Sequence, residues 1–393
     1  MASSRAARAA ASVEARPAGV LVDATAIPAD RGGVGRYLDE LVAQLDGPFV
    51  IACQARDAVH YRELAPSATV LPQHPRIQSV ARRLLWEQLS LPRLARRSGV
   101  SVIFSPHYTL PVLSRKKRVV TFHDATFFSD PGVHTPTKGR FFRAWIRLSS
   151  RLADAVVVPS IATASELARY IPRDVPRFDV AYHGVDRARF HEPTRAEVEV
   201  AATTLGLDGA PWIAFLGTVE PRKNVPSLVA AYRELVADWQ SDWGPVPALA
   251  IAGGRGWETG LDAEVARTAP PASVHVLGFI DLEIMRGFLG GATVVSYPSL
   301  GEGFGLPVLE AMACGAPVLT TRRLALPEVG GDAVAYSEPD SSSISDGLRA
   351  LVSDPVLRER LATRGIERSK RFSWRESAKT HQAVFARVTN GKV

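Results

Sequence analysis

Cysteine is scarce in this chain of 393 residues, which contains only Cys53 and Cys314. Two cysteines cannot build a disulfide framework, and they are too few for a cysteine-based metal centre. A low cysteine content is typical of proteins in a reducing compartment. We therefore predict a cytoplasmic protein with no structural disulfides.

Long apolar runs are also lacking. The longest, such as residues 153–159, are far shorter than the roughly 20 residues that a membrane-spanning helix needs. The first residues, MASSRAARAAASVEARP, are rich in alanine and arginine but have no continuous apolar core like that of a signal peptide. We predict that residues 1–17 form a disordered tail.

The positive charge is unevenly distributed. Residues 1–185 contain 25 Lys and Arg against 15 Asp and Glu, whereas residues 186–393 contain 22 against 25. This asymmetry suggests that the first half meets an anionic surface or partner. No zinc-finger spacing, RNP-like aromatic motif or basic region with a zipper is present, so the pattern favours an anionic membrane surface over nucleic acid.

Strand patterns alternate with helical patterns along the chain, which is typical of parallel α/β sheets. The length exceeds what one core usually holds, so we expect two domains. We predict two Rossmann-like, doubly wound domains that face each other across a cleft. The first covers residues 18–185, a linker covers 186–205, and the second covers 206–373. A closing helix, residues 374–393, follows Ser373 as a plausible N-cap.

The most informative segment is SLGEGFGLPVLEAMACGAPVLT, residues 299–320. A Gly-Phe-Gly turn leads into a helix that we expect Pro307 to open, because proline lacks an N–H that would be unpaired there. The backbone N–H groups at such a helix start form an anion site. Glu302 precedes this site and Glu310 follows it. Two carboxylates flanking an anion site suit a nucleotide-sugar, with its diphosphate between two sets of hydroxyl groups.

This spacing resembles the Glu, seven residues, Glu signature of the retaining nucleotide-sugar glycosyltransferases with the GT-B fold. The likeness continues through AMACGAPVLTT to LPEVGGDA and backward through GFI, DLEIM and ATVVSYPS. The resemblance implies that Glu302 contacts the donor sugar and Glu310 binds the ribose. It also places the backbone of Phe304, Gly305 and Leu306 at the donor diphosphate.

A second motif, FLGTVEPRKN, places two cations after a strand that ends near Gly217. Arg222 and Lys223 are predicted to open the next helix, at the edge where open α/β sheets bind ligands. Guanidinium and ammonium groups both bind phosphate. The resembled family commonly has an arginine directly after the glycine. Here Thr218 occupies that position, and we expect Arg222 to supply the cation.

The first half adds two features. The glycine segment from Gly32 to Gly35, with Gly33 as its candidate ligand-binding residue, resembles the family's N-terminal glycine loop. His123 follows the strand RVVTF, and the resemblance implies that it reaches the reacting carbon of the donor sugar. We expect Asp124 to orient its surroundings. His107 and His183 are interpreted as structural or cleft-lining residues, and Arg255 and Glu328 as secondary candidates.

No Asp-x-Asp triplet of the kind that binds a metal in the other major glycosyltransferase fold is present, so we expect no metal and no cofactor. The resemblance implies retention by a front-face route, because both glutamates are committed to hydroxyl recognition. A sugar-nucleotide epimerase, a phosphorylase and a non-catalytic nucleotide-sugar binding protein are the alternatives. The motifs look most like those of bacterial mannosyltransferases, which suggests GDP-mannose as the donor and a glycan or lipid-linked acceptor.

The segment KGRFFRAWIRLSSRL, residues 138–152, is predicted to be a helix with Phe141, Trp145, Leu148 and Leu152 on one face and arginines beside it. That composition suits a helix lying on an anionic bilayer. The alternative is that the apolar face packs on the sheet. If the membrane interpretation holds, the protein works at the inner face of the plasma membrane.

Overall fold

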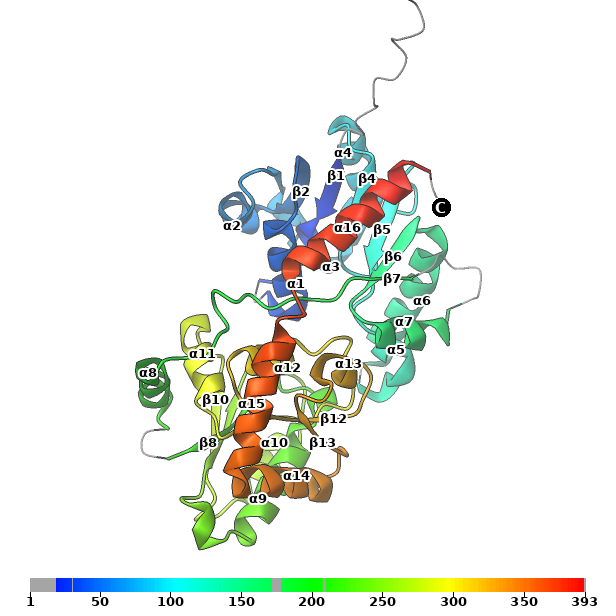
Figure 1. Cartoon of the computed structure of the whole chain (residues 1–393). Helices are drawn as coiled ribbons and strands as arrows, with labels where there is room; N and C mark the ends of the chain where they lie inside the picture. Colours follow the sequence, from blue (N-terminus) through cyan, green and yellow to red (C-terminus); the bar gives the residue numbers. More distant parts are fainter. Residues whose placement is uncertain (1–18, 30, 134, 172–177, 208–209, 392–393) are drawn as a thin grey trace, which may run out of the picture.

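The computed structural model describes residues 19–29, 31–133, 135–171, 178–207 and 210–391. The predicted tail, residues 1–17, lies outside them. Two parallel sheets form the centres of two domains, one above the other in Figure 1. This confirms the predicted fold class.

The first sheet has the strand order β3-β2-β1-β4-β5-β6-β7. Its strands are β1 (Val20–Asp23), β2 (Phe49–Gln54), β3 (Thr69–Gln73), β4 (Val102–Ser105), β5 (Lys117–Thr121), β6 (Ala155–Val158) and β7 (Phe178–Val180). The helices of this domain are α1 (Gly32–Ala43), α2 (Ala58–Leu64), α3 (Val80–Leu89), α4 (Leu91–Arg97), α5 (Thr126–Ser129), α6 (Pro136–Leu152) and α7 (Ile161–Ala168).

The second sheet has the order β10-β9-β8-β11-β12-β13. Its strands are β8 (Trp212–Leu216), β9 (Ala248–Ala252), β10 (Val274–Gly278), β11 (Val294–Tyr297), β12 (Val318–Thr321) and β13 (Ala335–Ser337). The helices around it are α8 (Arg195–Leu205), α9 (Val225–Ala237), α10 (Leu261–Ala266), α11 (Leu282–Gly290), α12 (Leu306–Ala313), α13 (Leu326–Gly330), α14 (Ser341–Ser353) and α15 (Pro355–Ser369).

The central strands are buried along their whole length, as sequences such as VLVD in β1 and WIAFL in β8 require. Helices cover both faces of a parallel sheet, so its strands read as continuous apolar runs without alternation. In both sheets the strand order reverses beside the first strand, between β1 and β4 and between β8 and β11. Ligands bind at such reversal points, outside the carboxyl ends of the strands.

Two segments of the chain cross between the domains side by side. The N–H of Val185 donates to the carbonyl of Phe372, and a Cβ on Gly184 would come within 2.0 Å of the backbone nitrogen of Trp374. Only glycine fits at Gly184. The predicted linker, residues 186–205, contains helix α8 in its second part. There α8 packs closely on α11, since a Cβ on Gly287 would lie 2.3 Å from the carbonyl oxygen of Glu197.

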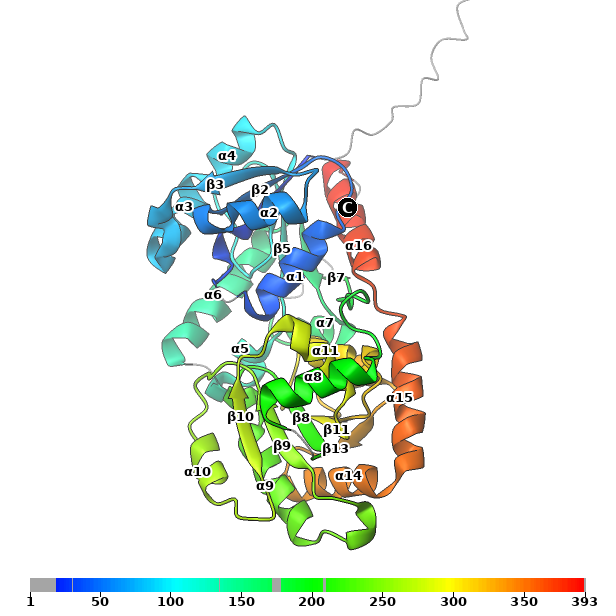
Figure 2. The same cartoon turned by 90° about the vertical axis from the view of Figure 1, so that its left-hand side faces the viewer.

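Helix α16 (Trp374–Thr389) follows the second crossing and lies on the first domain, in line with α15 on the second domain (Figure 2). The hydroxyl of Ser373 accepts the N–H of Arg375, as predicted for an N-cap. The ring of Phe385 packs 5.3 Å from that of Phe104 in β4, and His381 bonds to the hydroxyl of Tyr37 in α1. The end of the chain therefore completes the core of the first domain.

Removing the Phe385 ring tests this role. Phe385 is 3% exposed, and a buried Phe→Ala change costs about 3–5 kcal/mol through lost burial and the cavity left behind. We expect Phe385→Ala to lower the free energy of unfolding by that amount, measured by urea denaturation. Lys379→Ala, on the exposed side of α16, is the control and should change it by less than about 0.5 kcal/mol. Equal stability of the two variants would contradict the assignment.

Candidate functional site

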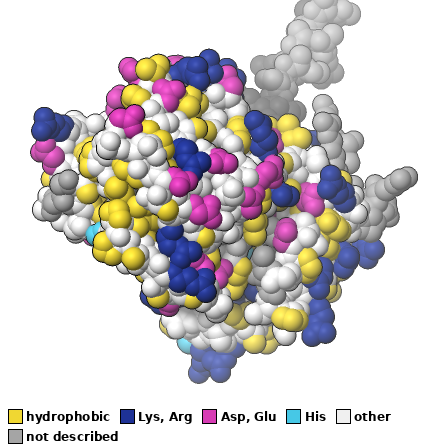
Figure 3. All heavy atoms as spheres, turned by 90° about the horizontal axis from the view of Figure 1, so that it is seen from below, with side chains coloured by type: hydrophobic (Ala, Val, Ile, Leu, Met, Phe, Trp, Pro, Cys, Tyr) yellow, Lys and Arg dark blue, Asp and Glu magenta, His cyan; other side chains and the backbone are white. Residues whose placement is uncertain are grey.

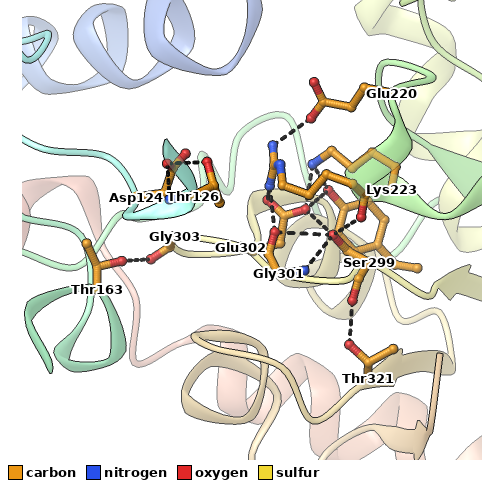
Figure 4. Close-up of polar contacts among 12 residues, drawn as sticks. Asp124, Thr126, Thr163, Glu220, Lys223, Ser299, Gly301, Glu302, Gly303 and Thr321 are labelled. Carbon is orange, nitrogen blue, oxygen red and sulfur yellow. Dashed lines mark hydrogen bonds and ion pairs between the residues drawn. The ribbon is translucent and has the colours of Figure 1, made fainter. Parts of the chain in front are cut away.

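The two loops that follow β8 and β11 meet at the reversal point of the second sheet. The loop after β8 contains Arg222 and Lys223, and the loop after β11 contains Glu302. Figure 4 shows Lys223 and Glu302 converging, with Ser299 and Gly301 beside them, and Arg222 Nη1 donates to the same Glu302 carboxylate. The structure thus brings the two sequence motifs, about 80 residues apart in the chain, into one cluster.

Glu302 is the centre of this cluster. Its carboxylate is buried and accepts four hydrogen bonds: from Lys223 Nζ at 2.6 Å, Ser299 Oγ at 2.6 Å, Tyr297 Oη at 3.0 Å and Arg222 Nη1 at 2.5 Å. Burial by itself would raise the pKa of Glu302, but Arg222 and Lys223 outweigh it and lower the pKa to about 2. The carboxylate is therefore ionised throughout the physiological range.

The cations are held in place by their own loop. A 3-10 turn over Pro221–Lys223 ends at Asn224, a non-glycine residue with a left-handed φ of 58°. The Asn224 amide donates to the carbonyls of Pro339 at 2.6 Å and Pro298 at 3.3 Å, which offsets this backbone conformation. The predicted helix start at Arg222 is wrong, because α9 begins only at Val225.

Arg222 and Lys223 differ in the partners to which they donate hydrogen bonds besides Glu302. Arg222 also donates to Glu220 Oε1 at 2.6 Å and to the Gly301 carbonyl at 2.7 Å. Lys223 is 8% exposed and donates to the hydroxyl of Tyr297. Burial and the neighbouring Arg222 lower the pKa of Lys223, against the pull of Glu302. Sequence inspection missed Tyr297, Ser299 and Asn224, whose roles depend on loop geometry.

The start of α12 is the predicted anion site. Gly305 caps the helix with φ 104°, a value that favours glycine, and α12 begins at Leu306. Pro307 is thus the second helical residue, not the first. In the part of the chain that the structure describes, the N–H groups of Phe304, Gly305 and Leu306 have no protein acceptor. These amides, at the positive end of the helix dipole, can hold a phosphate.

Glu310 lies within α12 and is only 2% exposed. Its carboxylate pairs with Arg36 of α1, from the other domain, through both guanidinium Nη atoms. Burial raises the pKa of Glu310, and the charge of Arg36 opposes that rise. The sequence motif located Glu310 correctly beside the anion site, but nothing in the sequence indicated Arg36 as its partner.

His123 lies two residues after β5, in the first domain. Its Nε2 is 2.7 Å from the carbonyl oxygen of Pro106, so Nε2 carries the proton and Nδ1 is an acceptor. Burial lowers the pKa of His123, which keeps the imidazole neutral. A Cβ on Gly303 would come within 1.7 Å of the His123 carbonyl oxygen. The loop that carries Glu302 therefore contacts the loop that carries His123.

Asp124 and Gly33 have clear local environments. The Asp124 carboxylate accepts the N–H and hydroxyl of Thr126 at 3.0 and 2.7 Å, which fixes the loop after β5. The glycine segment that we likened to a loop forms the first turn of α1 instead, because Arg31 in a left-handed conformation already acts as the N-cap. A Cβ on Gly33 would meet nothing within 4 Å, so its backbone faces open space.

Gly217 directly follows β8, and its carbonyl oxygen would lie only 2.0 Å from a Cβ on Gly253. The two strand ends can touch there only because Gly253 has no side chain. Arg255, a secondary candidate from the sequence, is exposed and pairs with Asp262. His107 and His183 have buried Nδ1 atoms without a partner among the described residues, and burial lowers the pKa of both imidazoles.

Glu328, another secondary candidate, has a different role. Its carboxylate accepts the N–H groups of Ile161 at 2.9 Å and Ala162 at 3.0 Å, at the start of α7, and the hydroxyl of Tyr182 at 2.6 Å. In the same region the hydroxyls of Ser160 and Thr163 donate to the Gly303 carbonyl at 2.7 and 3.0 Å. Glu328 therefore connects the two domains, next to the site.

Among the described residues, no group of three or more His, Cys, Asp and Glu side chains is arranged to hold a metal ion. The described helices include none that is long and apolar enough to cross a bilayer.

The buried cluster predicts a pH-dependent contribution to stability. The Glu302 pKa falls from 4.5 to about 2 on folding, which is worth on the order of 3 kcal/mol above pH 5 and is lost as the pH drops toward 2. We expect Glu302→Gln to lower the free energy of unfolding most at pH 7 and less at pH 3, measured by urea denaturation. Glu359→Gln on exposed α15 is the control. A deficit that does not shrink with falling pH would contradict the assignment.

Comparisons with known proteins agree with this geometry. The Glycosyltransferase Family 4 model matches residues 31–189, and the Glycosyl transferases group 1 model matches residues 203–368. The O-antigen chain mannosyltransferase B of Escherichia coli is 30% identical over 275 residues, which cover 70% of this chain and 71% of that protein. A D-inositol 3-phosphate glycosyltransferase of a Nocardioides species is 30% identical over 258 residues, covering 60% of this chain and 54% of that protein.

Solved structures share the fold at low identity. Sucrose-phosphate synthase from Thermosynechococcus elongatus superposes with a TM-score of 0.76 at 18% identity, covering 95% of this chain and all of that one. Anabaena Alr3699/HepE, solved in complex with UDP-glucose, gives a TM-score of 0.72 at 16% identity over 93% of this chain and 98% of that one. The chain is thus a glycosyltransferase with the GT-B fold and belongs to the glycosyl transferases group 1 family.

Proposed function

We propose that this glycosyltransferase moves a hexose, with mannose from GDP-mannose as the best candidate, to a hydroxyl group of a glycan or lipid-linked acceptor. The observation that carries the proposal is the Glu302–Lys223–Arg222 cluster beside the open amides of α12. Cations and amides suit a departing diphosphate, and a fixed carboxylate suits sugar hydroxyl groups. The similarity to an O-antigen chain mannosyltransferase supports mannose.

The residue roles follow from this placement. The α12 amides at Phe304, Gly305 and Leu306 hold the diphosphate, and Lys223 stabilises the charge that grows on it. Glu302 binds hydroxyl groups of the sugar. Glu310 binds those of the ribose. His123, a neutral imidazole at the facing loop, contacts the sugar near its reacting carbon.

We propose retention by a front-face route. The bond from the anomeric carbon to the phosphate oxygen breaks, and its electron pair leaves with the diphosphate. The acceptor oxygen bonds to the same face of that carbon, and its proton passes to the departing phosphate oxygen. The protein contributes position and charge stabilisation without a covalent intermediate and without a metal.

The test begins with donor binding. In a thermal-shift series of GDP-, UDP- and dTDP-sugars, the true donor at about 100 times its Kd adds about 2.7 kcal/mol of apparent stability. That donor is then incubated with mannose-containing glycans and with inositol 3-phosphate, and the anomeric configuration of the product is read by NMR. Inversion at the anomeric carbon would contradict the front-face route. Conversion of the donor in the absence of acceptor would instead indicate an epimerase.

The role of Lys223 is tested in the same transfer assay by comparing Lys223→Ala with Arg255→Ala. Lys223→Ala should lower kcat at least about tenfold, because one charge-assisted hydrogen bond to the leaving group is worth about 1.5–3 kcal/mol. Arg255→Ala removes a solvent-exposed cation of the same domain and should leave kcat within about twofold. Turnover should survive EDTA. Loss of transfer on chelation, with recovery on adding Mg²⁺ or Mn²⁺, would refute the metal-independent mechanism.

We also propose that α6 brings the first domain to the inner face of the plasma membrane. Phe142, Ile146 and Ser149 of α6 face the core, which leaves Phe141 and Trp145 half-buried and Leu148 38% exposed. The predicted apolar face thus packs on the core only at its Leu152 end. The exposed cations Arg140, Arg147 and Arg151 lie on the same helix. On the second-domain end of the molecule, basic and acidic side chains are interspersed (Figure 3).

Liposome co-sedimentation tests this surface. The full chain should sediment with anionic vesicles at low salt and be released as salt increases. Charge reversal of Arg140, Arg147 and Arg151 to glutamate should abolish sedimentation. Arg143 is left intact because it donates to the Phe127 carbonyl at 2.8 Å. Reversal of three exposed second-domain cations, Arg360, Arg364 and Lys370, to glutamate changes the net charge equally and is the control. Equal recovery in the supernatant with and without vesicles would refute the proposal.

A further inference from the structure

Arg36 is the one cation of the first domain that bonds across the cleft to a candidate donor-binding residue, among the residues that the structure describes. It lies in the second turn of α1, after the glycine segment, and its side chain is 36% exposed. Both Nη atoms point at the Glu310 carboxylate. The guanidinium also lies over the ring of Phe190, 5.7 Å from its centre.

This pair differs from the Glu302 cluster in how many partners hold it. Glu302 keeps three or more bonds whichever single partner is lost. The carboxylate of Glu310 has Arg36 as its sole hydrogen-bond partner within the described ranges. Any group that takes over Glu310 therefore releases Arg36 completely.

The released guanidinium would be close to the anion site. Glu310 is four residues beyond Leu306, or about 6 Å along the helix axis at 1.5 Å per residue. That distance is within the reach of an arginine side chain. The ion pairs of the site join Arg222 and Lys223 with Glu302 and Glu220, and Arg36 with Glu310. The positive charges of Arg222 and Lys223 are already paired with carboxylates. The negative charge of a bound diphosphate therefore calls for a further cation.

We propose that Arg36 is a donor-binding residue that exchanges partners: the ribose hydroxyl groups displace it from Glu310, and it then binds the diphosphate from the first-domain side. The inference rests on the proposed role of Glu310 and adds a cation that the sequence motif does not contain. A planar guanidinium is suited to this exchange, because it pairs bidentately with carboxylate and with phosphate alike. Donor binding thereby draws α1 toward α12.

The experiment measures Kd by calorimetry for GDP and for guanosine, with UDP and uridine as a second pair. The ratio of the nucleoside Kd to the nucleoside diphosphate Kd reports the contribution of the phosphates. We expect Arg36→Gln to lower this ratio at least about tenfold, the value of one charge-assisted hydrogen bond. Guanosine itself should bind as well or better, because Glu310 no longer has a competing partner.

The decisive comparison uses the Glu310→Gln background, where no buried carboxylate is left unpaired. There Arg36→Gln should still weaken GDP binding at least about tenfold, relative to Glu310→Gln alone. Arg189→Ala is the matched control, since Arg189 lies just after the first crossing segment and pairs with Glu40 of α1 and with Asp186. That control should leave the ratio unchanged.

Two failures are distinguishable. If Arg36→Gln has no effect on GDP affinity in the Glu310→Gln background, Arg36 only neutralises Glu310 and the inference is wrong, while the proposed function stands. If the wild-type protein binds none of GDP, UDP and dTDP, the proposed function itself fails.

Discussion

The site depends on the burial of one carboxylate. An ionised glutamate at 7% exposure is tolerable only if cations and hydroxyl groups surround it, because an unpaired buried charge costs several kcal/mol. Glu302 meets this condition because it accepts hydrogen bonds from Arg222 and Lys223 of the neighbouring loop and from Ser299 of its own loop. The two loops are thereby fixed at the strand reversal point before any ligand binds. A site organised in this way needs little rearrangement to receive a diphosphate.

The same loop also joins the domains. Its Gly303 carbonyl accepts the hydroxyls of Ser160 and Thr163, and its backbone abuts His123 with no room for a side chain. A residue one position from the buried glutamate therefore sets the distance between the domains. The position of the Glu302 carboxylate and the contact between the two domains therefore depend on one loop conformation.

The sequence predicted the layers, most strands and the paired motifs, because burial on both faces of a parallel sheet produces unmistakable apolar runs. It did not predict β3 or β7, which are the edge strands of the first sheet and have partly exposed residues. Within the site, Glu302 and Lys223 could be located by spacing. Asn224 and Arg36 could not, because one depends on a left-handed backbone and the other on a contact between residues 274 positions apart. Helix α8 was not predicted within the charged linker, although the Thr194–Glu197 capping box in the sequence could have indicated its start.

Polar contacts take part in joining the two domains at the site, beside apolar ones such as Leu306 against the first-domain core. Glu328 holds the start of α7 through hydrogen bonds, and Arg36 holds Glu310 through an ion pair. When such groups separate they are rehydrated, so each net contribution is only about 1 kcal/mol for a neutral hydrogen bond and somewhat more for a charged one. An apolar interface of similar size would resist opening more strongly. Polar contacts of this kind can separate and form again at small cost when two domains move relative to each other.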